Sequence, residues 1–246
     1  MLFTRAAMNT AKCVRLINMM GLEKLDGGDE SRMGPVLHPC KNWTEKEEHR
    51  RVFWGAYAID AHASVSTGWP TLINSNEIRT RLPSSEAAFA TGKEELTPFI
   101  EEIFDGAEYS TFASTLVSCH VYKSILNHVH RPKHTDHPED VVKGPFWERH
   151  RGFDTMLSSL LMFLPPNMRL HNGNKEPAAI YLNMNLHAAI ICLNHAAVEQ
   201  AEKYNLSPSM KQASIARMRS SAMEIANISK LAANMTQCFV SDSQHR

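Results

Sequence analysis

The chain has 246 residues, 43% of them hydrophobic, and its 26 Lys and Arg residues equal its 26 Asp and Glu residues in number. This length and apolar content are enough to fill one large hydrophobic core or two small ones. A formal net charge of zero, without a basic stripe, argues against a chain that binds DNA phosphates by itself.

The cysteines and the apolar runs exclude two further classes. The five cysteines form no Cys-x-x-Cys pair, which is typical of reduced thiols in an intracellular protein and speaks against a disulfide framework or a zinc cluster. They are Cys13, Cys40, Cys119, Cys192 and Cys238. The longest apolar run, Leu160–Leu164, ends at two prolines and is far shorter than the ~20 residues of a membrane-spanning helix. We therefore expect no contact with a membrane.

Apolar residues at helical spacing predict helices over residues 1–20, 45–66, 140–164, 177–204 and 208–238, and one or two helices within 95–128. Breaks occur at Gly21, in the loop 24–43 and in the loop 131–139, while Pro177 and Pro208 are suited to first helical turns. No alternating strand pattern extends beyond a few residues. The predicted fold class is all-α, built of packed antiparallel helices.

Residues 45–66 carry the strongest helix signal. Thr44 and Glu47 are spaced as a Thr-x-x-Glu capping box at the start, and Gly68 with Pro70 predicts the end. The spacing predicts an apolar face made of Val52, Phe53, Ala56, Ile59 and Ala63.

Charged residues interrupt this helix beside its aromatic residues Phe53 and Trp54, and they allow two interpretations. Arg50, Arg51 and Asp60 could lie on a solvated face, with the arginine stems covering the rings, or they could form a buried ion-pair network. The residues alone favour the solvated face, because charged side chains are seldom buried. We expect Phe53 to be buried and an arginine to pair with Asp60 or a nearby Glu.

Asp60 needs a partner outside its own helical turn. It lies nine residues after Arg51, which is ~13.5 Å along a helix axis and too far for a direct pair. We therefore expect its partner in segment 68–83 or on another helix.

The pattern Glu-x-x-Arg-Arg-x-Phe-Trp, followed by Asp, Gly-x-Pro and Ile-x-Thr-x-Leu-Pro, resembles a known family. It is similar to the regulatory domain, or middle homology region, of fungal binuclear zinc-cluster transcription factors, including the xylanolytic-activator type. The similarity is close over residues 1–85 and weaker beyond. The matching residues are Glu47 or Glu48, Arg50, Arg51, Phe53, Trp54, Asp60, Gly68, Pro70, Ile78, Thr80, Leu82 and Pro83.

Two residues depart from the family pattern. Ala61 and Trp69 stand where such proteins often carry Arg. Both changes remove a positive charge from the end of the helix, so any ion pair that the family makes there is in doubt for this chain.

The resemblance implies that residues 1–246 form one helical regulatory domain, with the motif in 1–85 and a helical remainder over 95–240. It implies a fragment that lacks the zinc-cluster DNA-binding module, so that zinc and DNA are bound outside this chain. It also implies control of RNA polymerase II transcription in the nucleus, with co-regulators or the transcription machinery as partners. A small-molecule effector and a second copy of the chain are further expected partners. No cofactor, catalytic residue or metal ligand is expected in this chain, and it is not expected to be an enzyme.

Histidines and methionines leave other functions open. Five histidines lie close in sequence, but Pro132 separates two of them and no His-Glu-x-x-His motif occurs, so an exposed polar loop is favoured over a metal site. They are His120, His128, His130, His134 and His137. His187, His195 and Met184 are candidate ligand-pocket residues, although such residues are more often part of a helical core.

Two alternatives therefore remain beside a regulatory domain. One is a helical metabolite-binding or metal-dependent enzyme that uses these histidines, and the other is a structural dimerisation module. No glycine-rich phosphate loop or nucleophile elbow supports a kinase, dehydrogenase or hydrolase.

Overall fold

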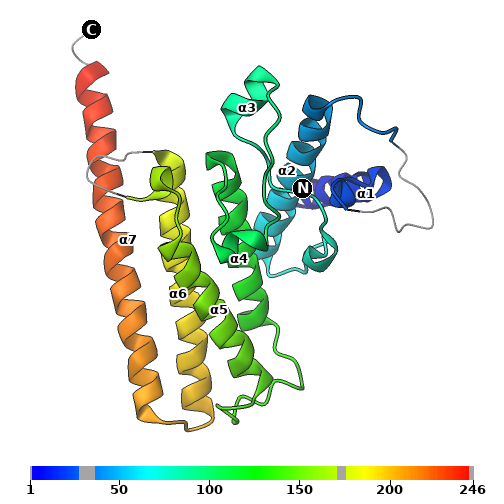
Figure 1. The fold of residues 1–246 in the computed structure, drawn as a ribbon. Helices are drawn as coiled ribbons and strands as arrows, with labels where there is room; N and C mark the ends of the chain where they lie inside the picture. Colours follow the sequence, from blue (N-terminus) through cyan, green and yellow to red (C-terminus); the bar gives the residue numbers. More distant parts are fainter. Residues whose placement is uncertain (1, 28–36, 171–175, 244–246) are drawn as a thin grey trace. The chain divides into compact units, whose positions relative to one another are not determined.

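A computed structural model describes residues 2–27, 37–170 and 176–243 (Figure 1). Over these residues the secondary structure is seven α-helices with four short 3-10 helices (η1–η4) and no strand, so the prediction of an all-α fold is confirmed. The helices are α1 (Leu2–Met20), α2 (Trp43–Thr67), α3 (Glu86–Thr91), α4 (Thr111–His130), α5 (Pro145–Met162), α6 (Pro177–Lys203) and α7 (Pro208–Ser243).

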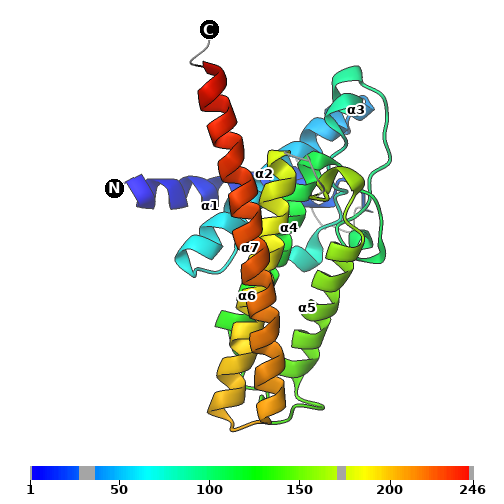
Figure 2. The ribbon, with the colours of Figure 1, turned by 90° about the vertical axis from the view of Figure 1, so that its left-hand side faces the viewer.

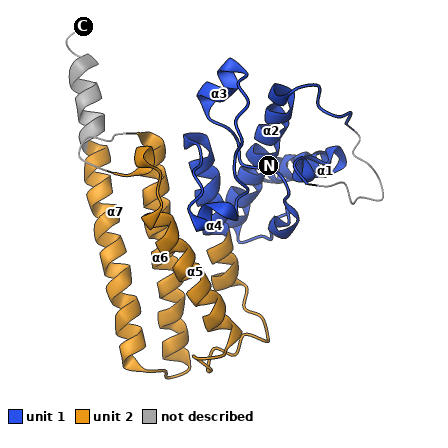
Figure 3. Cartoon of the chain, viewed as in Figure 1, with its two compact units in different colours: residues 1–123 blue, residues 124–246 orange. Residues whose placement is uncertain are grey.

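The chain divides into two compact units, residues 1–123 and residues 124–246, which Figure 3 colours separately. Helix α4 begins in the first unit and ends in the second. Among the described residues no helix is both long and apolar enough to cross a membrane.

Several predicted boundaries are confirmed. Helix α1 ends at Gly21, which takes the left-handed conformation with φ 70°, and α6 and α7 begin at the predicted prolines. The predicted 24–43 loop lies partly outside the described residues.

Two predictions of helices need correction, and one short helix was not predicted. Residues 95–110 are not α-helical and contain only the 3-10 helix η3 (Glu102–Asp105), because Pro98 and Gly106, with φ 95°, interrupt the helical spacing. Helix α5 begins at Pro145 and not near residue 140. The short helix α3, capped by the Ser85 side chain, gave no apolar repeat long enough to predict.

The core of the first unit forms around α2. Phe53, Trp54 and Tyr57 of this helix are fully buried, and Ile17 of α1 and Leu22 of η1 (Leu22–Lys24) are buried with them. The prediction that Phe53 is buried is confirmed. Later parts of the same unit add Leu82, Ile100, Ile103, Val117 and Val121 to the core.

In the second unit, α6 and α7 lie side by side and antiparallel in both views (Figures 1 and 2). The turn between them uses Asn205 with φ 52°. Helix α5 and the 3-10 helix η4 (Pro166–Met168) also pack on α6. The buried face of α6 repeats every three or four residues through Leu182, Leu186, Ala189, Ile190, Leu193, Ala197 and Ala201.

Candidate functional site

One face of α2 carries five side chains that bind residues 72–84, which we call the return segment. These side chains are three or four positions apart and therefore share one face of the helix. They are Glu47, Arg51, Trp54, Tyr57 and Asp60, and we call them the α2 stripe. The return segment follows the stripe backwards, from Asp60 towards Glu47.

At the carboxyl-terminal end of the stripe, Asp60 holds the start of the return segment. Its carboxylate accepts hydrogen bonds from the backbone N–H of Leu72, at 2.9 and 3.1 Å, and from that of Ile73, at 3.0 Å. Only 3% of Asp60 is exposed. These hydrogen bonds compensate the burial of the carboxylate. Because Leu72 and Ile73 lie within residues 68–83, the predicted partner in this segment is confirmed.

In the middle of the stripe, two aromatic rings combine a buried body with a bound polar end. The Trp54 indole N–H donates to the carbonyl oxygen of Arg81 at 2.7 Å. The Tyr57 hydroxyl lies 3.5 Å from Ser75 Oγ and 2.8 Å from His120 Nδ1. Burial raises the pKa of Tyr57 and lowers the pKa of His120 to about 4, so both groups are neutral at pH 7.

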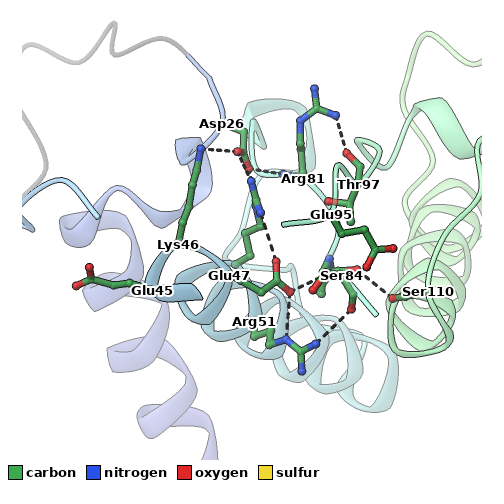
Figure 4. A network of polar contacts seen from close by, with 12 residues as sticks. Asp26, Glu45, Lys46, Glu47, Arg51, Arg81, Ser84, Glu95, Thr97 and Ser110 are labelled. Carbon is green, nitrogen blue, oxygen red and sulfur yellow. Dashed lines mark hydrogen bonds and ion pairs between the residues drawn. The ribbon is translucent and has the colours of Figure 1, made fainter. Parts of the chain in front are cut away.

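At the amino-terminal end, Glu47 is the centre of a buried network (Figure 4). Its Oε1 accepts hydrogen bonds from the backbone N–H of Ser84 at 2.8 Å and from Arg51 Nε at 3.1 Å. Its Oε2 lies 3.3 Å from Arg50 Nη1. The side chain of Glu47 is 0% exposed, so the two guanidinium groups and one N–H must replace its water shell.

Asp26 extends this network to the loop after η1. Arg50 donates to both of its carboxylate oxygens, at 2.6 and 3.0 Å, while Lys46 lies at 2.8 Å and the backbone N–H of Arg81 at 2.9 Å. Burial alone would raise the pKa of Asp26, but the hydrogen bonds from Arg50, Lys46 and Arg81 outweigh it and lower the pKa to about 2.

Arg51 connects the network to helices α3 and α4. It donates to the carbonyl oxygen of Ser84 at 3.2 Å and pairs with Glu86 of α3 at 2.7 Å. Its guanidinium also lies over the Phe89 ring, 4.1 Å from the centroid, and 5.3 Å from that of Phe112 in α4. One arginine therefore joins α2, α3 and α4 within the first unit.

The favoured interpretation of a solvated charged face is wrong, because Glu47, Arg50 and Asp60 are all buried. Of the two acids that matched the family pattern, Glu47 enters the network and Glu48 is exposed. The expected pairing of Arg50 or Arg51 with a nearby Glu is confirmed in Glu47.

The predicted apolar face is also partly wrong. Val52 is 52% exposed and Ile59 is 56% exposed, whereas Phe53 and Ala56 are buried. The buried face is centred on Trp54 and Tyr57 and includes charged residues. The spacing of apolar residues alone therefore does not identify the buried face of this helix.

The start of α2 differs from the predicted capping box. The N-cap is Asn42, whose side chain accepts from the backbone N–H of Glu45 at 2.9 Å, and the Glu45 carboxylate accepts from the N–H of Lys41 at 2.6 Å. Glu47 cannot serve as the capping carboxylate because both of its oxygens are bound in the buried network.

The end of α2 follows the prediction, with Gly68 in the left-handed conformation at φ 73° and its N–H bound to the carbonyl oxygen of Ser64. Pro70 is exposed just beyond. The two departures from the family pattern lie in different surroundings: Ala61 is buried, and Trp69 is 54% exposed and contacts the Phe3 ring edge to face.

The candidate ligand-pocket residues lie on α6 and contact different partners. His187 is half-buried, with Nδ1 3.5 Å from Ser221 Oγ of α7, and burial lowers its pKa. The His195 side chain is 58% exposed, 3.7 Å from Glu199. Met184 is half-buried. A ligand pocket at these residues stays a prediction.

The five clustered histidines also have separate surroundings. His120 contacts Tyr57, and His128 is buried among Phe146, His150 and Phe153, so the expectation of an exposed loop is wrong for these two. The remaining three are exposed: His130, His134 and His137.

The described residues do not fit a zinc site. No group of three or more His, Cys, Asp or Glu side chains among them lies close enough to hold a metal ion. Cys13, Cys40, Cys119 and Cys192 lie on separate elements, while the Cys238 side chain lies outside the described residues. A binuclear zinc cluster needs several cysteines close together, and these are not.

Curated relatives of this chain are transcription regulators of fungi. The pigment biosynthesis transcriptional activator pigB of Monascus ruber is 26% identical over 189 residues, which are 76% of this chain and 34% of that protein. The azaphilone cluster-specific transcription factor azaR of Aspergillus niger is 25% identical, over 78% of this chain and 41% of that protein. The citrinin biosynthesis transcriptional activator mrl3 of Monascus ruber is 30% identical over 167 residues, which are 66% of this chain and 31% of that protein.

The chain thus spans well under half the length of these relatives. No solved structure is significantly similar to it. Residues 9–135, which include the whole α2 stripe and the return segment, match the family described as the fungal specific transcription factor domain. Because this match covers more than half of the 246 residues, the chain belongs to that family of fungal transcription factor domains.

Proposed function

We propose that this chain is the regulatory domain of a fungal zinc-cluster transcription factor that controls RNA polymerase II transcription in the nucleus. The domain restrains an activation function until an effector or a partner protein binds. DNA and zinc are bound by a separate module, since the described cysteines do not fit a zinc cluster. We propose that residues 1–246 act together as this one regulatory domain.

The observation that carries the proposal is the family match over residues 9–135. This region contains the α2 stripe, in which buried ion pairs and backbone hydrogen bonds hold a segment without α-helix in a defined path. A rigid domain of this kind suits the binding of regulators, because restraint requires a stable conformation from which release can occur.

A reporter experiment tests the restraint. The whole chain is placed between a heterologous DNA-binding module and a strong activation segment, and reporter output is compared with that of the same fusion without the chain. We expect the chain to lower output several-fold. Glu47→Gln should restore much of that output, because it weakens the ion-pair network of Asp26, Lys46, Glu47, Arg50 and Arg51, which we call the α2 network.

The matched control is Glu48→Gln, which changes an exposed acid one position away. This variant should behave like the unchanged chain, with protein levels compared by immunoblotting. Equal output with and without the chain would contradict the restraint.

We further propose that the target genes belong to one biosynthetic cluster, because three relatives are named for pigment, azaphilone and citrinin regulation. Deleting the encoding gene in its own fungus should lower the transcripts of one group of adjacent biosynthetic genes, as measured by RNA sequencing. Unchanged transcripts under conditions that express the regulator would contradict this.

Partners beyond DNA stay proposals. Co-regulators or the transcription machinery would contact the domain directly. A second copy of the chain is the other candidate, which sedimentation velocity of the purified chain tests by a concentration-dependent rise in mass.

A further inference from the structure

A cavity of about 600 Å³ lies beside the α2 network, within the first unit. The end of α1, the 3-10 helix η1, residues 37–40 and the first turns of α2 line it. Met20, Leu25, Leu37 and Pro39 give it apolar walls. Its volume is in the range of about 300–1,000 Å³ that is typical of sites for small organic ligands.

Basic side chains line the same cavity. The lysines Lys24 and Lys46 and the histidines His38 and His49 are among its lining residues. Among the described residues no acidic side chain lines this space, and the ammonium group of Lys24 has no ion pair or hydrogen bond there. An ammonium group beside a cavity that no described acidic side chain lines attracts an anion.

Asp26, a carboxylate that pairs with Lys46 outside the walls, does not neutralise this charge. Its two oxygens bind Arg50, Lys46 and the N–H of Arg81. The two buried acids Asp26 and Glu47 together face three cations, Arg50, Arg51 and Lys46. The ammonium of Lys46 therefore adds a further positive charge to the cavity wall.

Cys40 and His49, which both line the cavity, also contact each other. Cys40 Sγ lies 3.3 Å from His49 Nδ1. Burial, and the negative charge of Glu45, raise the pKa of Cys40, so the thiol keeps its proton at pH 7.

We propose that this cavity binds a small organic acid, whose carboxylate pairs with Lys24 and Lys46 while its apolar body packs on Met20, Leu25 and Leu37. Apolar walls with a few convergent donors are the composition that fixes one end of such a ligand. Lys46 also pairs with Asp26, so a bound carboxylate competes for the outermost cation of the α2 network. This inference relies on the proposed regulatory function only for the consequence of binding.

Three acids and their neutral amides test the proposal by isothermal titration calorimetry on the purified full chain. The acids are 2-naphthoate, anthraquinone-2-carboxylate and decanoate, each compared with its primary amide. At least one acid should bind in the micromolar range, and its amide should bind about tenfold more weakly, because the amide keeps the apolar body and lacks the charge.

Two variants locate the binding. Lys24→Gln removes a cation that takes no part in the α2 network, and it should weaken binding of the acid about tenfold while leaving the amide unchanged. Leu37→Trp fills the apolar part of the cavity and should abolish both. Lys93→Gln, on the exposed segment after α3, is the matched control and should bind like the unchanged chain. Circular dichroism confirms that each variant is folded.

Three outcomes would overturn the inference: no acid binding below about 1 mM, equal affinity for acid and amide, or affinity unchanged by Lys24→Gln. None of these affects the reporter experiment, which needs no ligand. If the chain binds the acid but does not lower reporter output, the proposed function is contradicted and the cavity assignment remains.

Discussion

Single residues in α2 show how this domain tolerates charge in its interior. Glu47 is 0% exposed, and its oxygens are bound by Arg50, Arg51 and the N–H of Ser84. A buried ion pair adds little net stability over an apolar pair, but removing one partner leaves the other charge buried and unpaired. The network therefore makes the position of the return segment specific, because only one arrangement satisfies every charged group.

Glu47→Gln tests this argument at one residue. The amide is neutral but has the same size as the carboxylate. Arg50 therefore loses one of its two acidic partners, and Arg51 loses its buried acidic partner but keeps Glu86. We expect the free energy of unfolding to fall by about 3 kcal/mol, measured by urea denaturation. Glu48→Gln, on the exposed side of the same helix, should change it by less than about 0.5 kcal/mol.

Asp60→Asn tests the other end of the stripe. The amide keeps one oxygen acceptor but turns an NH2 group or a neutral oxygen towards the N–H groups of Leu72 and Ile73. We expect a loss of about 2 kcal/mol in thermal or urea unfolding, because charge-assisted bonds to a buried carboxylate are replaced. Asp105→Asn changes an exposed acid of the same unit and should be close to neutral.

At the scale of elements, α2 determines the path of a segment with little regular structure of its own. The return segment contains only the short 3-10 helix η2 (Ser75–Glu77). Its position depends on side chains of α2 that recur every three or four residues, each bound to its backbone or to the Ser75 side chain. The helix must consequently begin in the right place for these side chains to face one way.

The start of α2 gives a prediction with a built-in comparison. Asn42→Ala removes the side-chain acceptor of the N-cap and should cost about 1 kcal/mol of unfolding free energy. Thr44→Ala should cost clearly less, because Thr44 lies inside the helix and caps nothing. Equal losses from the two variants, measured under the same denaturant conditions, would contradict the assigned N-cap.

At the scale of the whole molecule, both units contain buried or half-buried neutral imidazoles, and this makes stability depend on pH. Burial lowers the pKa of His120 in the first unit, and of His128 and His150 in the second, to about 4. Arg149 and His150 lower the pKa of His128 further, while Asp136, which pairs with Arg149, opposes them. Both ring nitrogens of His128 lack a hydrogen-bond partner among the described residues.

The direction of this pH dependence follows from how many protons the folded and unfolded chains bind. Between the unfolded pKa of about 6.5 and the folded value near 4, the unfolded chain binds more protons, so stability falls as the pH is lowered through this window. For His128 we expect a loss of about 1–2 kcal/mol between pH 7 and pH 5. His128→Phe should reduce that dependence and leave stability at pH 7 unchanged or higher, as thermal unfolding at both pH values would show.

The order of the helices could largely be predicted from the sequence, because local signals specify it. Pro177, Pro208, Gly21 and Gly68 act through their own backbone conformations and mark true helix ends. The prediction was wrong for residues 95–110, since Phe99, Ile103 and Phe104 are spaced as in a helix but do not lie in an α-helix.

The candidate site was predictable only in part. The family pattern identified the right helix, and the distance from Arg51 to Asp60 correctly required a partner beyond Gly68. The spacing Glu-x-x-Arg-Arg is met by Glu47 and not by Glu48, although both acids were matched to the family pattern. Contact with Ser84 and the arginines shows that Glu47 is the acid in the network. The roles of Trp54 and Tyr57 as hydrogen-bonding members of the stripe were missed, since their partners lie far along the chain.

The sequence by itself determined the all-α class, the helix ends set by Gly and Pro, and the family to which the chain belongs. These depend on local backbone preferences and on residue identities. Only the tertiary structure decided which charges are buried, which face of α2 is inside, and that basic residues from three segments line one cavity. The physical reason is that burial of a charge depends on partners brought together by folding, such as Asp26 with Arg50, and no pattern within one helix contains them.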